Sequence, residues 1–346
     1  MINTISLIDF KAFNETTVDF SNLTILCGVN GGGKSSIIQA ILLLAQTKMA
    51  LNNNKLEYIN LNGYYLKYFT KKELLHVAGG DKIEIKINDE KFVLTDELQI
   101  DSRLKLENEI ELDFFKNFQF ISADRFGPKR YQEDTVLEST SVGKNGENVF
   151  KVLTHFYTEI GEKVENNLEK IFGEKISIQP NRISSDTHIS SLGLKNYVSH
   201  DADYLNPVHM PFGISYILPI IVALETFLFS HSTEKSILII ENPEAHLHPR
   251  AQSNLGRLFT EYSSENLQII VETHSEHIIN GSLLGIKDKN MNKDNLVINF
   301  FTKGNSLGSH KINKISFNEN MEIESWPDGF MDQFTNDSFK LLLVDP

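Results

Sequence analysis

Residues 28–35 read Gly-Val-Asn-Gly-Gly-Gly-Lys-Ser. This stretch decides the fold of the chain, because it matches the pattern G-x-x-x-x-G-K-[ST] at every fixed position. Glycines at these positions let the backbone wrap a polyphosphate with its N–H groups pointing inward. Lys34 then reaches the β- and γ-phosphates, and the hydroxyl of Ser35 holds Mg²⁺. The stretch therefore predicts a phosphate-binding loop.

The segments on both sides of this loop have the character that the motif requires. Residues 23–27 form a short apolar run with β-branched members, which is typical of a buried strand. Residues 36–49 are apolar almost all round and rich in helix formers, which is typical of a buried helix. Strand, glycine loop and helix in this order predict an α/β fold of the P-loop NTPase type.

Composition narrows the class of protein. The chain has 346 residues, 40% of them apolar, which is enough for one large domain or two ordinary ones. Its single cysteine, Cys27, leaves no disulfide framework and is best explained as a core residue. The net charge of −13 is unlike that of a free-standing nucleic-acid binder, although local basic patches leave nucleic acid open as a partner.

The sequence predicts no membrane association. The N-terminus has no basic segment and no cleavage pattern, so we expect no signal peptide. The longest apolar run, residues 217–229, is too short to span a bilayer and is interrupted by Pro219 and Glu225. We therefore expect a soluble, cytoplasmic protein.

The first half of the chain alternates between apolar and polar residues in two places. Residues 2–20 predict two short strands around a turn near residues 14–15. Residues 80–115 predict a small antiparallel sheet that begins with a hairpin around residues 88–90. We expect a β-rich insertion over 51–115 between the loop helix and the next core strand.

The second half combines core elements with another insertion. A helix over 148–172, followed by short strand-like runs, predicts a mostly helical lobe over 140–205. Both insertions would belong to one domain that spans 1–346. Further core elements are expected as a helix over 250–262 and a strand over 267–271. The last stretch of the chain predicts a turn at 327–329 and edge strands at 296–301, 311–317 and 323–326.

A second strong signal lies at residues 237–241. Four apolar residues end in Glu241, which predicts a buried strand with a carboxylate at its tip. A P-loop enzyme needs such a carboxylate opposite the phosphate loop, to hold Mg²⁺ and orient water. A buried strand that ends in an acidic residue is common by itself. Together with the glycine loop in the same chain, it is specific for a P-loop enzyme.

Two further strand or helix ends carry polar residues whose role the pattern leaves open. Asp124 and Arg125 follow an apolar strand, where ligands bind in open α/β sheets, and a structural ion pair explains them equally well. Ser215 lies near the start of an apolar helix. It is interpreted as an N-cap in preference to an anion site.

Histidines follow both acidic strand ends. His246 and His248 lie near Glu244, but without a third ligand group at a suitable spacing they do not favour zinc. His274 follows the strand over 267–271 and could sense the γ-phosphate or polarise water. A Ser-His-Asp hydrolase is disfavoured, because no G-x-S-x-G elbow is present.

Several motifs in order resemble one superfamily. The phosphate loop, Ile-Glu-Asn-Pro-Glu-Ala-His-Leu-His-Pro at 240–249 and Glu-Thr-His-Ser-Glu-His at 272–277 resemble the ABC-type ATPase heads of the SMC, RecF and OLD (overcoming lysogenization defect) group. The runs at 121–125, 212–215 and 326–330 resemble that group as well. Within it, the chain is most similar to stand-alone prokaryotic AAA-family ATPases encoded in anti-phage defence and mobile-element loci.

The resemblance implies roles for individual residues. Glu241 would be the Walker B acid that, with Ser35, holds Mg²⁺, and His274 would be the switch histidine near the γ-phosphate of ATP. Gly213 and Ser215 would belong to a degenerate signature motif that closes over ATP held by a second subunit. Residues 245–249 would form the D-loop, which also faces that subunit. The Walker A residues would be Gly28, Asn30, Gly31, Gly32, Gly33, Lys34, Ser35 and Ser36.

Two departures from the pattern affect the expected chemistry. ABC heads usually have a glutamate after the Walker B acid as the general base, and this chain has Asn242. An amide cannot take a proton, so hydrolysis would be slow unless Glu244 substitutes. The signature also lacks the usual glycine pair after its serine, because Tyr216 follows Ser215.

The resemblance implies an ATPase that sandwiches ATP between two copies and uses closure as a switch. We expect a homodimer or higher oligomer that acts in anti-phage defence. No long heptad region is present, so the chain is not a full SMC-like tether. No Toprim-like acidic cluster is present either, so we expect the nuclease or toxin to be a separate protein. Alternatives are a RecF-like DNA repair ATPase, which the acidic balance disfavours, and a transporter subunit, which the incomplete signature disfavours. A nucleotide-bound scaffold with little turnover is kept open by Asn242.

Overall fold

A computed structural model describes thirteen stretches of the chain. These are residues 1–50, 58–67, 70–77, 79–80, 82–95, 103–106, 115–134, 140–183, 188–196, 204–288, 291–304, 310–318 and 320–342. Parts of the predicted β-rich insertion, namely 51–57, 96–102 and 107–114, lie outside the described residues.

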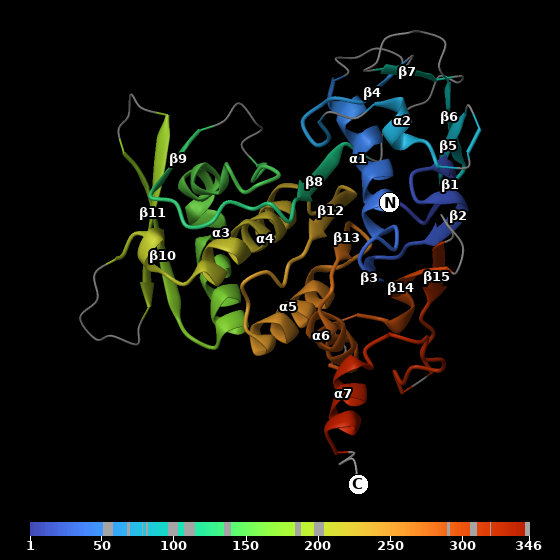
Figure 1. Ribbon diagram of the computed structural model, residues 1–346. Coiled ribbons are helices and arrows are strands. Elements are labelled where there is room, and N and C mark those ends of the chain that lie inside the picture. Colours follow the sequence, from blue (N-terminus) through green and yellow to red (C-terminus); the bar gives the residue numbers. More distant parts are fainter. Residues whose placement is uncertain are drawn as a thin grey trace.

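A six-stranded sheet runs through the centre of the molecule (Figure 1). Its strands, in spatial order, are β15 (His310–Lys314), β14 (Leu296–Lys303), β3 (Leu23–Gly28), β13 (Leu267–Glu272), β12 (Ser236–Glu241) and β8 (Asn117–Ile121). All neighbours are parallel except β15, which is antiparallel to β14. The sheet confirms the predicted α/β class.

The central strands are apolar along both faces because each face is covered. In β12, Ile237 and Ile239 pack into one core, whereas Leu238 and Ile240 pack into the other. Period-two alternation with apolar residues on both sides is what a parallel sheet between two layers requires. The predicted strands over 23–27 and 237–240 are present, each extended by a residue or two.

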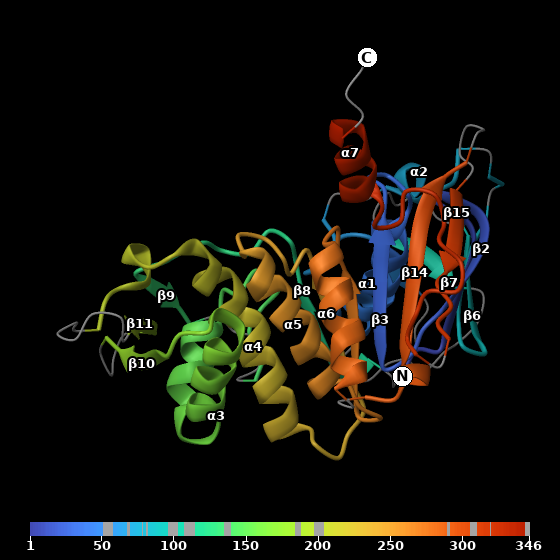
Figure 2. The same cartoon turned by 90° about the horizontal axis from the view of Figure 1, so that it is seen from below.

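The first face of the sheet carries helix α1 (Lys34–Ala50) and, beyond it, a second sheet (Figure 2). This antiparallel sheet has the order β2 (Phe13–Asp19), β1 (Thr4–Phe10), β5 (Ile83–Ile87), β6 (Glu90–Thr95), β7 (Arg103–Leu106) and β4 (Tyr58–Asn60). A short helix, α2 (Lys71–Leu74), lies between β4 and β5 in the chain. The hairpin predicted at 88–90 is confirmed.

The first hairpin turns earlier than predicted. Phe10 pairs with Phe13, so the chain reverses at residues 11–12 and not near 14–15. Asp9 and Lys11 have φ angles of 53° and 49° there, a left-handed conformation that polarity alternation does not reveal. The prediction of the turn position was wrong for that reason.

The layer on the opposite face of the sheet contains four helices. They are α3 (Val149–Phe172), α4 (Phe212–Ser230), α5 (Pro249–Tyr262) and α6 (Glu276–Lys287), which share one hydrophobic core with the sheet. Next to α3 lies a three-stranded antiparallel sheet in the order β10 (Ile176–Arg182), β11 (Ile189–Asn196) and β9 (Tyr131–Glu133) (Figure 1). The described part of 140–205 thus combines the predicted helix, α3, with two strands, and β10 and β11 pair antiparallel where strand-like runs were predicted.

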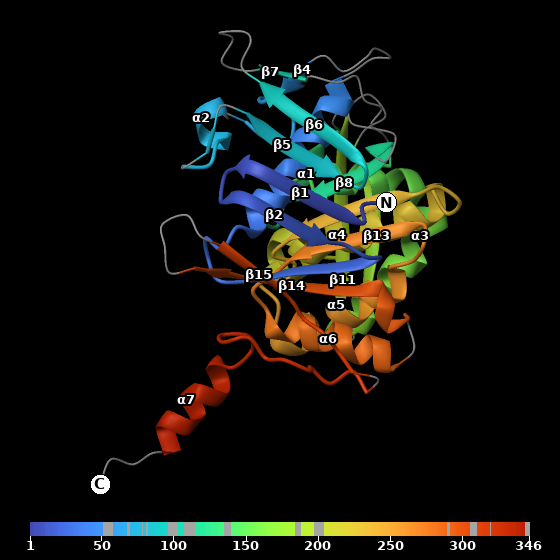
Figure 3. The same cartoon turned by 90° about the vertical axis from the view of Figure 1, so that its right-hand side faces the viewer.

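The C-terminal stretch differs from the prediction in three ways. β14 lies inside the central sheet, so of the strands β14 and β15 only β15 lies at an edge. Residues 323–326 form no strand, since Ile323 makes an isolated bridge to Phe317. Helix α7 (Gln333–Leu342), which the pattern did not indicate, projects from the body (Figures 1 and 3). The turn at 327–329 is confirmed by a 3.0 Å hydrogen bond from Phe330 N–H to the Pro327 carbonyl.

The described residues also include two single-turn 3₁₀ helices. They lie at Pro207–His209 and Lys293–Asn295.

Helix α4 is a core helix. It is long and apolar enough to cross a membrane by composition alone, but 67% of its apolar stretch is buried inside the fold. It begins at Phe212 with Pro211 at the N-cap position, so Ser215 lies within the first turn. The prediction that Ser215 caps this helix was wrong, because the helix starts three residues before it.

Glu225 interrupts the apolar sequence of α4 for a structural reason. The side chain is 1% exposed, and its Oε1 accepts hydrogen bonds from Asn167 Nδ2 at 2.6 Å and from the Tyr262 hydroxyl. These bonds connect α3, α4 and α5. Burial raises the pKa of Glu225 above its ordinary value of 4.5, although the two hydrogen bonds lower it in part.

Glu225→Gln is expected to stabilise the protein at pH 8 by about 1–2 kcal/mol. The folded state holds the Glu225 proton more tightly than the unfolded state, so stability falls as pH rises from 4.5 through the raised folded pKa. Glutamine keeps the acceptor oxygen and removes the charge. Urea unfolding at pH 5 and pH 8 measures the effect, with Glu159→Gln on the exposed side of α3 as control. An equal change in the free energy of unfolding at both pH values would contradict the interpretation.

Candidate phosphate-binding site

The loop between β3 and α1 has a backbone that favours glycine at three positions. Gly28, Gly31 and Gly33 have φ angles of 123°, 69° and 107°. A Cβ atom on Gly28 would lie 2.1 Å from the carbonyl oxygen of Phe301 on β14. These constraints give the loop the shape of a cradle at the N-terminus of α1, which is suited to a phosphate group.

Lys34 and Ser35 begin helix α1 at the base of this loop. The Lys34 ammonium is buried and donates hydrogen bonds of 3.0 Å to the carbonyl oxygens of Gly28 and Val29. Burial lowers the pKa of Lys34, and the carboxylate of Glu272 partly restores it. Ser35 Oγ donates to the carboxylate of Glu272, with distances of 3.1 Å to Oε1 and 3.4 Å to Oε2.

Two carboxylates meet at the ends of neighbouring strands. Glu241 on β12 and Glu272 on β13 are in register. By alternation they share the face of Ile239 and Ile270, which is the face that α1 covers. Burial, with the nearby charge of Glu272, raises the pKa of Glu241 to about 7, and the Ala123 N–H bonds its Oε2 at 3.2 Å. Burial also raises the pKa of Glu272.

The donor set suits a hard divalent cation. Ser35 supplies a hydroxyl oxygen, Glu272 supplies a carboxylate oxygen 3.1 Å from it, and Glu241 lies in register beside Glu272 on the neighbouring strand. Mg²⁺ bound together with a nucleotide needs only one or two protein carboxylates, because phosphates and water complete its shell. Among the described residues, no cluster of three or more His, Cys, Asp or Glu side chains could hold a metal ion.

Glu244 and His274 lie beside each other above the strand ends. The Glu244 carboxylate accepts a hydrogen bond of 2.7 Å from the Thr273 hydroxyl and one of 2.8 Å from the His274 N–H. Partial burial and the charge of Lys34 lower the pKa of His274 from its ordinary value, which favours the neutral imidazole. The side chain of His274 also lines a pocket of about 180 Å³ next to Gly28.

Asn242 follows Glu241 in a left-handed turn with a φ angle of 43°. Its N–H donates to the carbonyl of Glu272 at 2.8 Å. Its side-chain Oδ1 is buried and has no hydrogen-bond partner among the described residues. The position therefore joins β12 to β13 through the backbone and offers no carboxylate to the site.

Arg125 fixes the end of β12 from the side of β8. Its guanidinium donates bonds of 2.7 Å to the carbonyls of Glu241 and Asn242, and one of 2.8 Å to that of Ser122. The side chain is 2% exposed, and burial lowers its pKa to about 10. Asp124 is exposed. Neither a ligand role nor an ion pair with Asp124 explains Arg125, which clamps backbone carbonyls.

The start of α4 packs against the turn that follows β12. A Cβ atom on Gly213 would lie 2.9 Å from the carbonyl oxygen of His246, so the two segments approach closely. The rings of Tyr216 and His246 contact each other at a centroid distance of 4.4 Å. His248 Nδ1 accepts from Arg250 N–H at 3.4 Å and caps α5.

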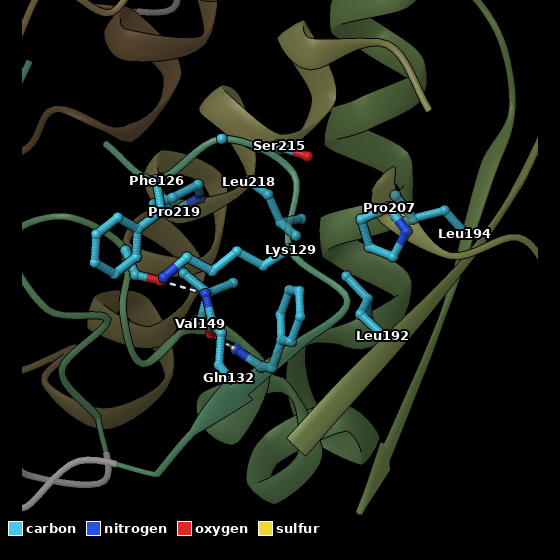
Figure 4. A pocket seen from close by; sticks show the side chains of 13 residues that line it. Phe126, Lys129, Gln132, Val149, Leu192, Leu194, Pro207, Ser215, Leu218 and Pro219 are labelled. Carbon is cyan, nitrogen blue, oxygen red and sulfur yellow. Dashed lines mark hydrogen bonds between the residues drawn. The ribbon is translucent and has the colours of Figure 1, made fainter. Parts of the chain in front are cut away.

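A cavity beneath Ser215 is not a nucleotide site. It lies between α3, α4 and β11, and Figure 4 shows Phe126, Lys129 and Leu218 among its lining. Its volume of about 20 Å³ holds a single water molecule at most. Figure 4 also shows how Gln132 and Ser215 come from separate segments around it.

The place of Glu272 at this site does not follow from its motif, Glu-Thr-His-Ser. It depends on how β13 aligns with β12. One signal was available. Glu241 and Glu272 each end a six-residue apolar strand, so parallel pairing in register brings them together.

Comparisons with known proteins agree with this geometry. The family model "AAA domain, putative AbiEii toxin, Type IV TA system" matches residues 101–280, and the model "AAA ATPase domain" matches residues 1–190. Each covers more than half of the chain. A comparison with curated proteins gives no significant match.

Solved structures of SMC heads share the fold. The SmcHead bound to the C-winged helix domain of ScpA is 15% identical with a TM-score of 0.59, over 92% of this chain and 99% of that one. The Smc head domain with an extended coiled coil, from Pyrococcus furiosus, is 12% identical with a TM-score of 0.56, over 99% and 98%. The chain belongs to the AAA ATPase domain family and has the fold of an SMC-type ATPase head.

Proposed function

We propose that this protein binds ATP between two copies of the chain, hydrolyses it slowly, and acts as a switch or sensor in anti-phage defence. The observation that carries the proposal is the junction of Lys34 and Ser35 with the carboxylates at the ends of β12 and β13. The description of one matching family model as a putative AbiEii toxin supports a defence role.

We assign ATP and Mg²⁺ to the residues of this junction. Gly28, Asn30, Gly31, Gly32 and Gly33 would wrap the phosphates, with Lys34 and Ser36 at the start of α1. Ser35 and Glu241 would hold Mg²⁺, which supplies charge stabilisation at the transferring phosphoryl group.

Glu244 is our candidate for the general base of hydrolysis, because the amide of Asn242 cannot accept a proton from water. Thr273 and the His274 N–H fix its carboxylate, and a fixed carboxylate can accept a proton from water. His274, whose neutral form is favoured, would contact the γ-phosphate as a hydrogen-bond donor. Turnover is expected to be slow, since Glu244 lies two residues beyond the usual position.

A second copy of the chain would complete the site. Gly213 and Ser215, which start α4, would close over the nucleotide of the partner copy, and the exposed His246 ring would lie at that interface. SMC heads that carry this fold bind ScpA, which supports a separate protein effector for this chain. Nucleic acid stays open as a further partner, and we place the protein in the cytoplasm.

Within this function, residues 51–115 and 140–205 would be insertions into one ATPase domain over 1–346. The described part of the first pairs with β1 at the outer sheet, and the second adds α3 and β10–β11 beside α4. Both insertions lie beside helices that we place at the nucleotide, α1 and α4. They are therefore suited to change position when ATP binds or is hydrolysed.

Light-scattering mass with and without ATP, combined with ATP turnover, tests the switch. ATP is expected to raise the mass of the wild type, and Ser215→Arg should prevent that rise while a single copy still binds ATP. Loss of turnover with intact assembly in Glu244→Gln would identify the base. ATP binding without a change in mass or turnover would mean that the nucleotide is a structural scaffold.

A further inference from the structure

We propose that Glu272 is the second carboxylate of the Mg²⁺ site and acts there with Ser35 and Glu241. This inference rests on the proposed ATP-binding function. The matched motif assigns metal binding to the hydroxyl of Ser35, and the resemblance assigns it to Glu241. Neither assigns a role to Glu272, which lies on the strand between β3 and β12.

The contact between Ser35 and Glu272 has the spacing of two ligands of one cation. Ser35 Oγ lies 3.1 Å from Glu272 Oε1. Oxygens on neighbouring corners of an octahedron with bonds of about 2.1 Å lie about 3 Å apart. The two side chains therefore need little movement to share a cation.

Charge balance at the strand ends also favours a cation. Glu272 is 7% exposed, and Glu241 lies beside it in register. Lys34 is the cation that most favours the charged form of Glu272. When Lys34 turns toward a phosphate, the buried carboxylate of Glu272 and the half-buried carboxylate of Glu241 lose that compensation, and burying an unpaired charge is costly. A divalent cation restores the balance.

Glu272 has an orientation that Glu244 lacks. Both oxygens of Glu244 are engaged by the segment after β13, at Thr273 and His274. The carboxylate of Glu272 instead faces the first turn of α1, where its partner is the side chain of Ser35. A purely structural role would need only an acceptor for Ser35, which glutamine also provides.

Binding of a fluorescent ATP analogue, measured across free Mg²⁺ concentrations and in excess EDTA, tests the inference. For Glu272→Gln, we expect affinity in EDTA to equal or exceed that of the wild type, because a negative charge near the phosphates is removed. The Mg²⁺ concentration that gives half of the Mg²⁺-dependent gain should rise about 10- to 100-fold. Glu265→Gln, at an exposed position just before the start of the same strand, should leave both quantities unchanged.

The outcomes separate this inference from the proposed function. An unchanged Mg²⁺ dependence in Glu272→Gln would overturn the role of Glu272 while ATP binding stands. Absence of nucleotide binding by the wild type would overturn the function itself. Glu272→Asp, which keeps the charge one methylene further back, should show an intermediate shift, and it decides the case if the glutamine variant does not fold.

Discussion

The Lys34→Ala protein is expected to hydrolyse ATP at least about 100-fold more slowly than the wild type. The Lys34 ammonium already lies at the mouth of the loop, bonded to the carbonyls of Gly28 and Val29 at 3.0 Å. A phosphate oxygen is a stronger partner for an ammonium than a neutral carbonyl, so the charge is poised to move to a nucleotide. Phosphate release under saturating ATP measures the loss.

Two companion variants make the result for Lys34 specific. Lys311→Ala removes an exposed lysine of β15 and should leave turnover unchanged. Lys34→Arg keeps the charge beside Glu272, so thermal unfolding should stay near that of the wild type. Its planar group cannot replace the compact ammonium as a point contact to a phosphate, so turnover should still fall. Full turnover in Lys34→Ala would contradict the assignment of this loop to the phosphates.

The elements that the sequence predicts well are those defined by local pattern. Strand, glycine loop and helix over 23–50 follow from composition within a short window, and so does the hairpin between β5 and β6. Period-two alternation and turn residues are visible without knowledge of the rest of the fold. The motif then places Lys34 and Ser35 at the loop.

The parts that the sequence did not reveal depend on long-range contacts. Glu272 reaches Ser35 because β13 pairs with both β3 and β12, and no local pattern contains that register. From the sequence, Glu225 is interpreted only as an interruption of the apolar run over 217–229. It is buried because Asn167 and Tyr262, from two other helices, bond it. The turn at 11–12 depends on backbone φ angles, which alternation does not encode.

The sequence position of Arg125 indicated that the residue is important, but it did not indicate what the side chain contacts. Its strand-end location predicted a ligand or an ion pair. Its partners are instead the carbonyls of Ser122, Glu241 and Asn242, and its guanidinium lies 5.5 Å from the centroid of the Tyr216 ring. It thereby joins β8, the end of β12 and the start of α4. Loss of this clamp should affect stability and turnover together.

Arg125→Met is expected to lower the free energy of unfolding by about 3 kcal/mol, because three charge-assisted hydrogen bonds are lost from a buried position. Turnover should fall about 100-fold, since a shift of about 1 Å in catalytic groups costs that much. The loss should appear in kcat and not in KM for ATP, because the loop over 28–35 does not contact Arg125. Urea unfolding and steady-state kinetics measure the two effects.

The matched control is Arg130→Met, which removes an exposed arginine from the same segment and should change neither quantity. Arg125→Lys should recover part of the stability but little turnover, since an ammonium cannot bond the carbonyls on both sides as a planar fork does. If Arg125→Met keeps wild-type kcat despite lower stability, the end of β12 is positioned by its pairing with β13 alone. The bond from Asn242 N–H to the Glu272 carbonyl would then be the element that holds Glu241 in place.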